Sequence, residues 1–234
     1  MGQVIGVLGG MGAAATVDFY DKVTSHVLAD RDQDHPQILI YSHAKVPDRT
    51  EFLVGEGEDP TSALVEGARL LKNAGADFLA VPCNTAHVFM DAVCQEVGIR
   101  LVSMIEAVAD ELATAFPHVT NVGLVATTGT LVTGLYRQTL EERGLTLLQP
   151  SEEIQAEQVM PAISLLKGGD TGPETRKRVE EIEEGLVEAG AEVVIAACTE
   201  IPLVLSGDNS PVPVVDTTDV LARRVLLEAG VRCR

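Results

Sequence analysis

Short runs of apolar and β-branched residues alternate along the chain with longer stretches whose apolar residues recur every three or four positions. The short runs are typical of buried strands, and the longer period is typical of helices that bury one face. Strands are predicted at 4–8, 37–41, 78–82, 101–103, 121–126, 145–148, 193–197 and 212–216. Helices are predicted at 14–29, 60–74, 85–96, 105–115, 129–143, 155–166, 173–189 and 218–229. This alternation predicts an α/β protein with parallel sheets flanked by helices.

Blocks of the first half of the chain recur in the second half. AGADFLAVPC at 74–83 and AGAEVVIAAC at 189–198 align without a gap, at an offset of 115 residues. IGVLGGMGAAATVDFY resembles VGLVATTGTLVTGLY in the same way, and LVSMIEAVADEL resembles VVDTTDVLARRVL. Three similar blocks in one order indicate that one α/β unit has been duplicated. We therefore expect two similar Rossmann-like domains with four-stranded parallel sheets, related by pseudo-two-fold symmetry, and an active site in the interdomain cleft.

The amino-acid composition, above all its negative net charge, excludes some classes of ligand and partner. A net charge of -18 argues against nucleic acid, because nucleic-acid binding depends on neutralising phosphates with Lys and Arg. An anionic substrate would need local positive charge from the Lys and Arg side chains, which number 17 together. No apolar stretch approaches the roughly 18 residues that span a bilayer. The apolar start has no basic residues before it and does not resemble a signal peptide, so we expect a cytoplasmic protein without a membrane partner.

Two of the four cysteines occupy matched positions. Cys83 and Cys198 end the two aligned blocks, each at the carboxyl end of a predicted strand, where parallel sheets bind ligands. Cys94 and Cys233 have no such match. The spacing of the four shows no C-x-x-C and no zinc-finger histidine, which argues against a structural metal, and a cytosolic chain argues against a disulfide framework. If the halves are related by a pseudo-two-fold axis, the matched thiols occupy equivalent places and can face each other.

Two opposed thiols can invert a stereocentre at a Cα atom. One removes a proton from one face while the other returns a proton to the opposite face. The dipeptides Asn84-Thr85 and Thr199-Glu200 are predicted to begin helices, whose first amides would stabilise each thiolate. A single cysteine is more often a small buried hydrophobe, but a matched pair favours the reactive interpretation. A Cys–His hydrolase that uses His87 is the competing reactive interpretation; nothing in the second half matches His87, and we interpret it as structural.

The glycine-rich loop after the first strand fits G-x-G-x-x-A, the dinucleotide-binding fingerprint. A nicotinamide enzyme would also need an acid at the end of the second strand, but that strand ends Tyr41-Ser42-His43. A glycine turn whose amides reach a carboxylate explains the loop equally well, and Thr127-Thr128-Gly129-Thr130 is its counterpart. Arg49 in VPDRTEF and Lys167 before a glycine pair are cationic loop residues that could hold such a carboxylate. A surface ion pair and a solvated helix end are the alternatives for these two.

The segments GGMGAAATVDFYDKV, VPDRTEFL, PCNTAH, ATTGTLVTGLY, ACTEIPLVL and PVVDTTDVLA occur in this order and resemble the aspartate/glutamate racemase family, most closely its aspartate racemases. The resemblance implies an N-terminal domain of residues 1–104 plus a returning segment 214–234, and a second domain of residues 105–213. It implies a homodimeric isomerase that needs neither pyridoxal phosphate nor a metal. It implies that Cys83 and Cys198 are catalytic and that Arg49 and Lys167 bind the carboxylates of an amino-acid substrate. Further pocket positions implied by the resemblance are Met11, Gly12, Asn84, Thr85, Thr127, Gly129, Thr130, Thr199 and Glu200.

Two departures from the family pattern leave the substrate open. The loop reads GGMGAAAT, where the family often has Pro and an acid, and 41–45 lacks the asparagines that aspartate racemases often carry. Aspartate, glutamate and a broader range of amino acids are therefore alternatives. A maleate isomerase, a hydantoin racemase and a decarboxylase are alternatives within the superfamily. A protein that binds an acidic ligand without chemistry is the alternative from another class.

Overall fold

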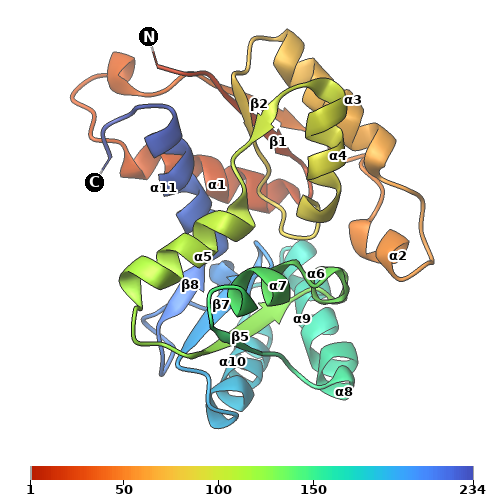
Figure 1. Cartoon of the computed structure of the whole chain (residues 1–234). Helices are drawn as coiled ribbons and strands as arrows, with labels where there is room; N and C mark the ends of the chain where they lie inside the picture. The colour runs from red at the N-terminus through yellow and green to blue at the C-terminus, as the bar shows by residue number, and fades with distance from the viewer. Residues whose placement is uncertain (1, 234) are drawn as a thin grey trace. The chain divides into compact units, whose positions relative to one another are not determined.

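The computed structural model describes residues 2–233. The chain divides into two compact units: unit 1 runs up to Ala107 and resumes at Thr218, and unit 2 is Val108–Thr217. Each unit contains one four-stranded sheet in which all neighbouring strands are parallel, and helices flank each sheet (Figure 1). The predicted α/β class with two four-stranded parallel sheets is confirmed.

The sheet of unit 1 has the order β2-β1-β3-β4. Its strands are β1 (Ile5–Gly9), β2 (Ile38–Ser42), β3 (Phe78–Ala80) and β4 (Arg100–Leu101). Its helices are α1 (Ala13–His26), the 3-10 helix η1 (Asp32–Asp34), α2 (Arg49–Leu53), α3 (Thr61–Asn73) and α4 (His87–Val97). The helices α5 (Met104–Ala115) and α11 (Thr217–Glu228) contain the two boundaries between the units.

Alternating side chains of β1 and β3 build a core on each face of this sheet. Leu8 and Leu79 lie in a buried cluster with residues of α3 and α4. Val7 and Phe78, one position away on each strand, lie in a second cluster with residues of α1 and α11. Because successive side chains of a strand point to opposite faces, a sheet covered on both sides needs apolar residues at consecutive positions. This requirement explains the unbroken apolar runs of the sequence.

The sheet of unit 2 has the order β6-β5-β7-β8. Its strands are β5 (Asn121–Ala126), β6 (Thr146–Leu148), β7 (Val193–Ala197) and β8 (Val214–Asp216). Its remaining helical segments are α6 (Thr128–Thr133), α7 (Leu135–Glu141), α8 (Glu152–Ile154), the π-helical turn η2 (Gln155–Val159), α9 (Met160–Lys167), α10 (Pro173–Glu188) and the 3-10 helix η3 (Ile201–Leu203). Val125 and Val194 pack on one face of this sheet against residues of α9 and α10.

The two units repeat hydrogen bonds as well as strand order. The Asp77 carboxylate accepts the backbone N–H of Val4 at 2.7 Å, just before β1 begins. Glu192, which lies 115 residues later, accepts the N–H groups of Thr120 and Asn121 at 2.8 Å each, where β5 begins. The same pairs also bond through their backbones, from Asp77 N–H to the Val4 carbonyl and from Glu192 N–H to the Asn121 carbonyl. A repeated cap of this kind supports the inferred duplication.

Several predicted boundaries were wrong. The predicted helix 129–143 is two helices, because Gly134 adopts a left-handed conformation with φ 67° that ends α6. The predicted helix 155–166 begins three residues earlier, at α8, and passes through a π-helical turn. The short helix α2 was not predicted; it forms because the Asp48 carboxylate accepts the N–H groups of Thr50 and Glu51 and caps its first turn.

The return to unit 1 lies four residues after the expected boundary at residue 214. Val214–Asp216 forms β8, whose backbone pairs in parallel with β7 from Val194 to Ala196. These ladder hydrogen bonds keep the segment in unit 2, so the return to unit 1 begins at Thr218. The other boundary lies after Ala107 rather than after residue 104.

Candidate active site

The candidate residues of each unit follow the carboxyl ends of neighbouring strands. In unit 1, residues 11–12 follow β1, Arg49 follows β2 and residues 83–85 follow β3. The strand order places β1 between β2 and β3, so these three connections leave the same edge of one sheet. In unit 2, residues 127–130 follow β5 and residues 198–200 follow the adjacent strand β7.

Cys83 lies in a buried setting that His87 holds in place. The thiol residue belongs to the same core cluster as Met11 and Val46, which come from the connections after β1 and β2. His87, the first residue of α4, contacts the Cys83 carbonyl through Nδ1 at 2.9 Å. Its Nε2 accepts the backbone N–H of Met104 at 3.0 Å. The connection after β3 is therefore tied to the start of α5.

This network assigns the tautomer of His87. Because Nε2 accepts a hydrogen bond, the ring proton lies on Nδ1, which donates to the Cys83 carbonyl. Burial lowers the pKa of His87 to about 4, against a smaller opposing effect of the hydrogen bond to Cys83. A neutral imidazole with both nitrogens engaged is not poised to deprotonate a thiol. The geometry agrees with the structural interpretation of His87 and disfavours a Cys–His hydrolase.

Arg49 is a buried cation and not the member of a surface ion pair, which was the alternative for this residue. It is the first residue of α2 rather than a loop residue, and only 8% of it is exposed. Its Nη1 donates to the carbonyls of Val46 and Pro47, at 3.4 Å and 3.0 Å. Its Nε is buried without a hydrogen-bond partner, and no carboxylate pairs with the guanidinium within residues 2–233. A buried charge without a paired acid is costly to the fold.

The glycine loop after β1 has a packing role. Gly10 has φ 89°, and a Cβ atom there would lie 2.5 Å from backbone atoms of His43. Its N–H donates to Thr16 Oγ1 at 2.9 Å, and the Gly12 carbonyl accepts from the same hydroxyl at 2.9 Å. The loop therefore packs on the connection after β2, and Met11 is buried within it. Close approach of two backbones accounts for Gly10 without a dinucleotide.

In unit 2, Cys198 and Thr199 surround a buried carboxylate. The Cys198 thiol donates to Glu200 Oε2 at 3.1 Å, and the Thr199 hydroxyl donates to the same oxygen at 3.2 Å. Glu200 is 2% exposed and Cys198 is 5% exposed. Burial first, and then the Glu200 charge, raise the pKa of the Cys198 thiol well above its usual range; the charge of Lys167 opposes them.

The prediction that a helix begins directly after Cys198 and stabilises its thiolate was wrong. Only the three-residue 3-10 helix η3 follows, starting at Ile201, and the stretch beyond it is rich in Gly and Pro, which do not continue a helix. No long helix starts at this sulfur. The Glu200 backbone N–H lowers the pKa of the thiol, but the Glu200 carboxylate beside it raises that pKa. After Cys83, α4 begins at His87, two residues later than predicted.

The remaining candidates of unit 2 lie around the turn after β5 and at the end of α9. Thr127 caps α6 by accepting the Thr130 N–H at 3.1 Å, and both side chains are buried. Gly129 is buried within the same helix. Lys167 is the exposed last residue of α9, where a loop was expected, and its charge acts on the Cys198 thiol. Asn84 and Thr85 in unit 1 are likewise buried.

Gln155 supports the same turn and was not anticipated. Its Nε2 donates to the Ala126 carbonyl at 3.0 Å and to Thr128 Oγ1 at 3.3 Å, so it braces the end of β5. Its Oε1 is buried and has no hydrogen-bond partner in the described part of the chain. The only sequence signal for Gln155 is its position at the start of a predicted helix. Polar residues are common there, so this position does not indicate a contact with the turn after β5. The contact depends on the π-helical turn, which sequence patterns do not indicate.

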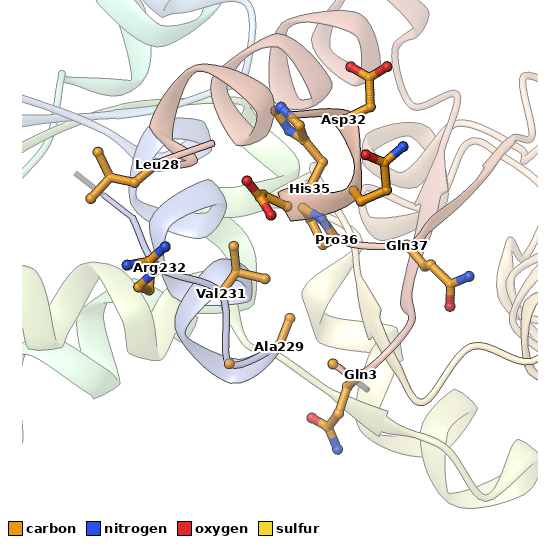
Figure 2. Close-up of a pocket in the computed structure, with 13 residues that line it drawn as sticks. Gln3, Leu28, Asp32, His35, Pro36, Gln37, Ala229, Val231 and Arg232 are labelled. Atoms are coloured by element: carbon orange, nitrogen blue, oxygen red, sulfur yellow. The ribbon is translucent and has the colours of Figure 1, made fainter. Parts of the chain in front are cut away.

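A large pocket of unit 1, about 710 Å³ in volume, lies elsewhere (Figure 2). Gln3 and Gln37, which line it, directly precede β1 and β2, and the side chains of Asp32, His35 and Arg232 also surround it. These positions mark the amino ends of the strands, at the edge of the sheet opposite to Cys83. The pocket is therefore separate from the candidate active-site residues.

Within residues 2–233, no group of three or more His, Cys, Asp or Glu side chains is placed to hold a metal ion. No helix in this range has both the length and the apolar character to cross a membrane. All four cysteines are free thiols.

Comparison with known proteins agrees with this arrangement. A family model described as Asp/Glu/Hydantoin racemase matches residues 8–225. The aspartate racemase of Picrophilus torridus superposes with a TM-score of 0.88 at 31% identity, covering 100% of this chain and 96% of that one. An aspartate racemase homologue from Pyrococcus horikoshii gives a TM-score of 0.76 at 30% identity, covering 98% and 100%. The broad specificity amino-acid racemase RacX of Bacillus subtilis is 28% identical over 225 residues, covering 94% of this chain and 95% of RacX. The resemblance seen in the motifs is thus confirmed, and the chain belongs to the Asp/Glu/Hydantoin racemase family.

Proposed function

We propose that this protein interconverts L- and D-aspartate by two-base proton exchange between Cys83 and Cys198, without pyridoxal phosphate or a metal. The observation that carries the proposal is the equivalence of the two cysteines. Each ends a block repeated at an offset of 115 residues, and each follows the third strand along the chain of a sheet with the same strand order. Equivalent thiols supply the acid and the base that inversion at one carbon requires.

The proposed step is balanced in protons. A thiolate removes the Cα proton, the C–H bonding electrons stay on the substrate as a carbanion, and the other cysteine's S–H protonates the opposite face. The product is the mirror-image amino acid, and the two cysteines have exchanged protonation states. Turnover in the reverse direction starts from that exchanged state, so the same pair serves both enantiomers.

Arg49 supports an acidic substrate. Its buried guanidinium has no carboxylate partner in the described residues, and the planar group suits bidentate contact with a carboxylate. Lys167 provides a second cation that acts on the Cys198 thiol. In the proposal these two cations bind the two carboxylates of aspartate, and the candidate residues that follow β1, β3, β5 and β7 provide the remaining contacts with the substrate.

The central test follows racemisation by chiral chromatography in heavy water. The wild type is expected to convert L-aspartate to a racemic mixture and to introduce solvent deuterium at Cα. C83A and C198A should each lose at least about 10³-fold in kcat, since each removes one of the two proton-transfer groups. C94A and C233A are the matched controls and should stay active. Full racemase activity in C83A or C198A would overturn the two-base proposal.

A broad-specificity racemase is the second candidate, favoured by the similarity to RacX across 94% of this chain. A panel of L-aspartate, L-glutamate and neutral amino acids separates the two. Selective turnover of aspartate supports the proposal, and comparable turnover of neutral amino acids supports the alternative. Calorimetry that shows tight aspartate binding without loss of optical rotation would instead indicate a binding protein. Homodimer formation and a cytoplasmic location stay predictions from the sequence.

A further inference from the structure

The two thiols have different neighbours. Cys198 donates a hydrogen bond to a carboxylate oxygen that is almost fully buried, and the Thr199 hydroxyl orients that same oxygen. The corresponding position after Cys83, offset by the same 115 residues, is Thr85, which is neutral. The duplicated blocks therefore differ in charge two residues after each cysteine.

A carboxylate in this position favours one protonation state. A carboxylate can only accept a hydrogen bond, so the contact with Cys198 requires the S–H form of the sulfur. A thiolate there would place two negative charges about 3 Å apart in a buried site. Lys167, at the end of α9, and the Glu200 backbone N–H oppose this effect of the carboxylate. Lys167 is exposed, however, whereas the Glu200 carboxylate is buried beside the sulfur.

We propose that Glu200 is a positioning residue that holds Cys198 as a neutral thiol, so that the resting enzyme has Cys198 as its acid and Cys83 as its base. This proposal rests on the two-base function proposed above. It adds that the pair is not symmetric. The state ready to accept one enantiomer is more populated than the state ready to accept the other.

The equilibrium constant of the reaction determines which kinetic constants can reveal this asymmetry. The two enantiomers have equal free energy in water, so the equilibrium constant is one and kcat/KM must be the same in both directions. Unequal populations of the two protonation states can therefore change KM only if kcat changes by the same factor. KM should be lower for the enantiomer that binds the more populated state. Removing the Glu200 charge should change the ratio of the two KM values while the two kcat/KM values stay equal.

The first experiment measures the thiol directly and needs no turnover. The full-length protein is alkylated with iodoacetamide from pH 5 to pH 10, and modification of the Cys198 peptide is quantified by mass spectrometry. Because the reagent attacks the thiolate, E200Q should lower the pH midpoint for Cys198 by about one unit or more, which means about tenfold faster alkylation at neutral pH. E200D retains a carboxylate and should retain a high midpoint. E188Q removes an exposed charge from α10 and should leave the midpoint unchanged.

A second measurement uses the wild type and is independent of whether E200Q folds. The infrared S–H stretch at neutral pH, taken as a difference against C198S, should show a hydrogen-bonded thiol. Absence of that band, or an E200Q midpoint equal to that of the wild type, overturns the role of Glu200. Racemisation in which the KM ratio of the two enantiomers is the same in E200Q and wild type overturns it as well. Loss of the two-base function itself would appear in the cysteine variants and would leave the alkylation and infrared results interpretable.

Discussion

Arg49, His87 and Glu200 are buried polar side chains whose surroundings differ. Glu200 accepts two side-chain hydrogen bonds, and His87 uses both ring nitrogens. Arg49 instead keeps a buried Nε without a partner in the described residues. A buried polar group that lacks its hydrogen bond destabilises the fold by roughly 1–3 kcal/mol. Under the proposed function, a carboxylate of the substrate would complete this interaction.

Replacing Arg49 is expected to separate stability from activity. R49M keeps most of the side-chain volume and removes the uncompensated charge. The free energy of unfolding without substrate should stay equal or rise by about 1 kcal/mol, as at other functional sites that sacrifice stability. The same variant should lose at least about 100-fold in kcat/KM for aspartate. Urea unfolding and the chiral assay give the two quantities, with the exposed R137M as control. Strong destabilisation by R49M would assign Arg49 a structural role instead.

His87 predicts an acid-dependent loss of stability. Its pKa is about 4 in the folded protein, below the ordinary 6.5 expected when unfolded. The unfolded chain therefore binds this proton first as the pH falls below 6.5, and stability decreases down to about pH 4. The integrated effect is about 3 kcal/mol. Urea unfolding at pH 7 and pH 4.5 should show a smaller difference in H87Q than in the wild type. H118Q, at an exposed position, should behave like the wild type.

At the residue scale, the sequence indicates the positions of the candidate residues better than their environment. The places of Cys83, Cys198 and the glycine loop after strands could be predicted because these residues lie at repeated positions beside recognisable strands. The burial of Arg49 could not, since Asp48 and Glu51 around it are typical of an exposed turn. The contact of Glu200 with Cys198 depends on how the chain turns between β7 and η3. The sequence predicts only helix amides at the sulfur, whereas the structure places the Glu200 carboxylate there beside the Glu200 backbone N–H.

At the scale of elements, the strands are more predictable than the helices that connect them. All four strands of each sheet were predicted, with ends within two residues, because burial on both faces requires continuous apolar runs. The helical connections carry weaker signals. Gly134 breaks a stretch that otherwise has the helical period, and the π-helical turn at 155–159 follows from packing rather than from a residue pattern. Long amphipathic helices such as α3 and α10 were predicted nearly to their ends.

Matched glycines provide a test of the duplication. Gly75 and Gly190 have φ 104° and 101°, and each follows a helix that leads into the third strand of its sheet. G75A and G190A should each destabilise the protein by about 1–2 kcal/mol, because an L side chain disfavours this conformation. G185A, within α10 and with open space at its Cβ, should instead stabilise by about 0.5–1 kcal/mol. Urea unfolding measures all three. A large difference between G75A and G190A would show that the two turns are not energetically equivalent.

At the scale of the whole molecule, net charge and local charge act in opposite directions. The net charge of -18 repels an anionic substrate, whereas Arg49 and Lys167 are proposed to attract it. Salt shortens the screening length from roughly 30 Å at 0.01 M to about 8 Å at 0.15 M, so it screens distant acids before it screens groups in contact.

Activity toward aspartate should therefore increase with moderate salt. Raising sodium chloride over this range is expected to increase kcat/KM by about twofold or more, as the long-range repulsion is removed. The chiral assay at fixed pH measures the change. R49M serves as a comparison, since its long-range field is nearly that of the wild type while its local attraction is weaker. A steady fall in kcat/KM with salt would show that local cations dominate even at a distance.

The repeated strand order has a consequence for how such a protein can diversify. Both cysteines follow strands that correspond between the units. Arg49 and Lys167 lie on the corresponding β2–β3 and β6–β7 connections, but these connections are built differently and carry the two cations at different places. Arg49 begins a five-residue helix after β2, and Lys167 ends a different helix between β6 and β7. If these cations select the substrate as proposed, substitutions or insertions in those two connections can exchange one amino acid for another without moving either thiol. The duplicated strands would then keep the two thiols and the reaction unchanged. Sequence changes in the two differing connections would alter which amino acid is bound.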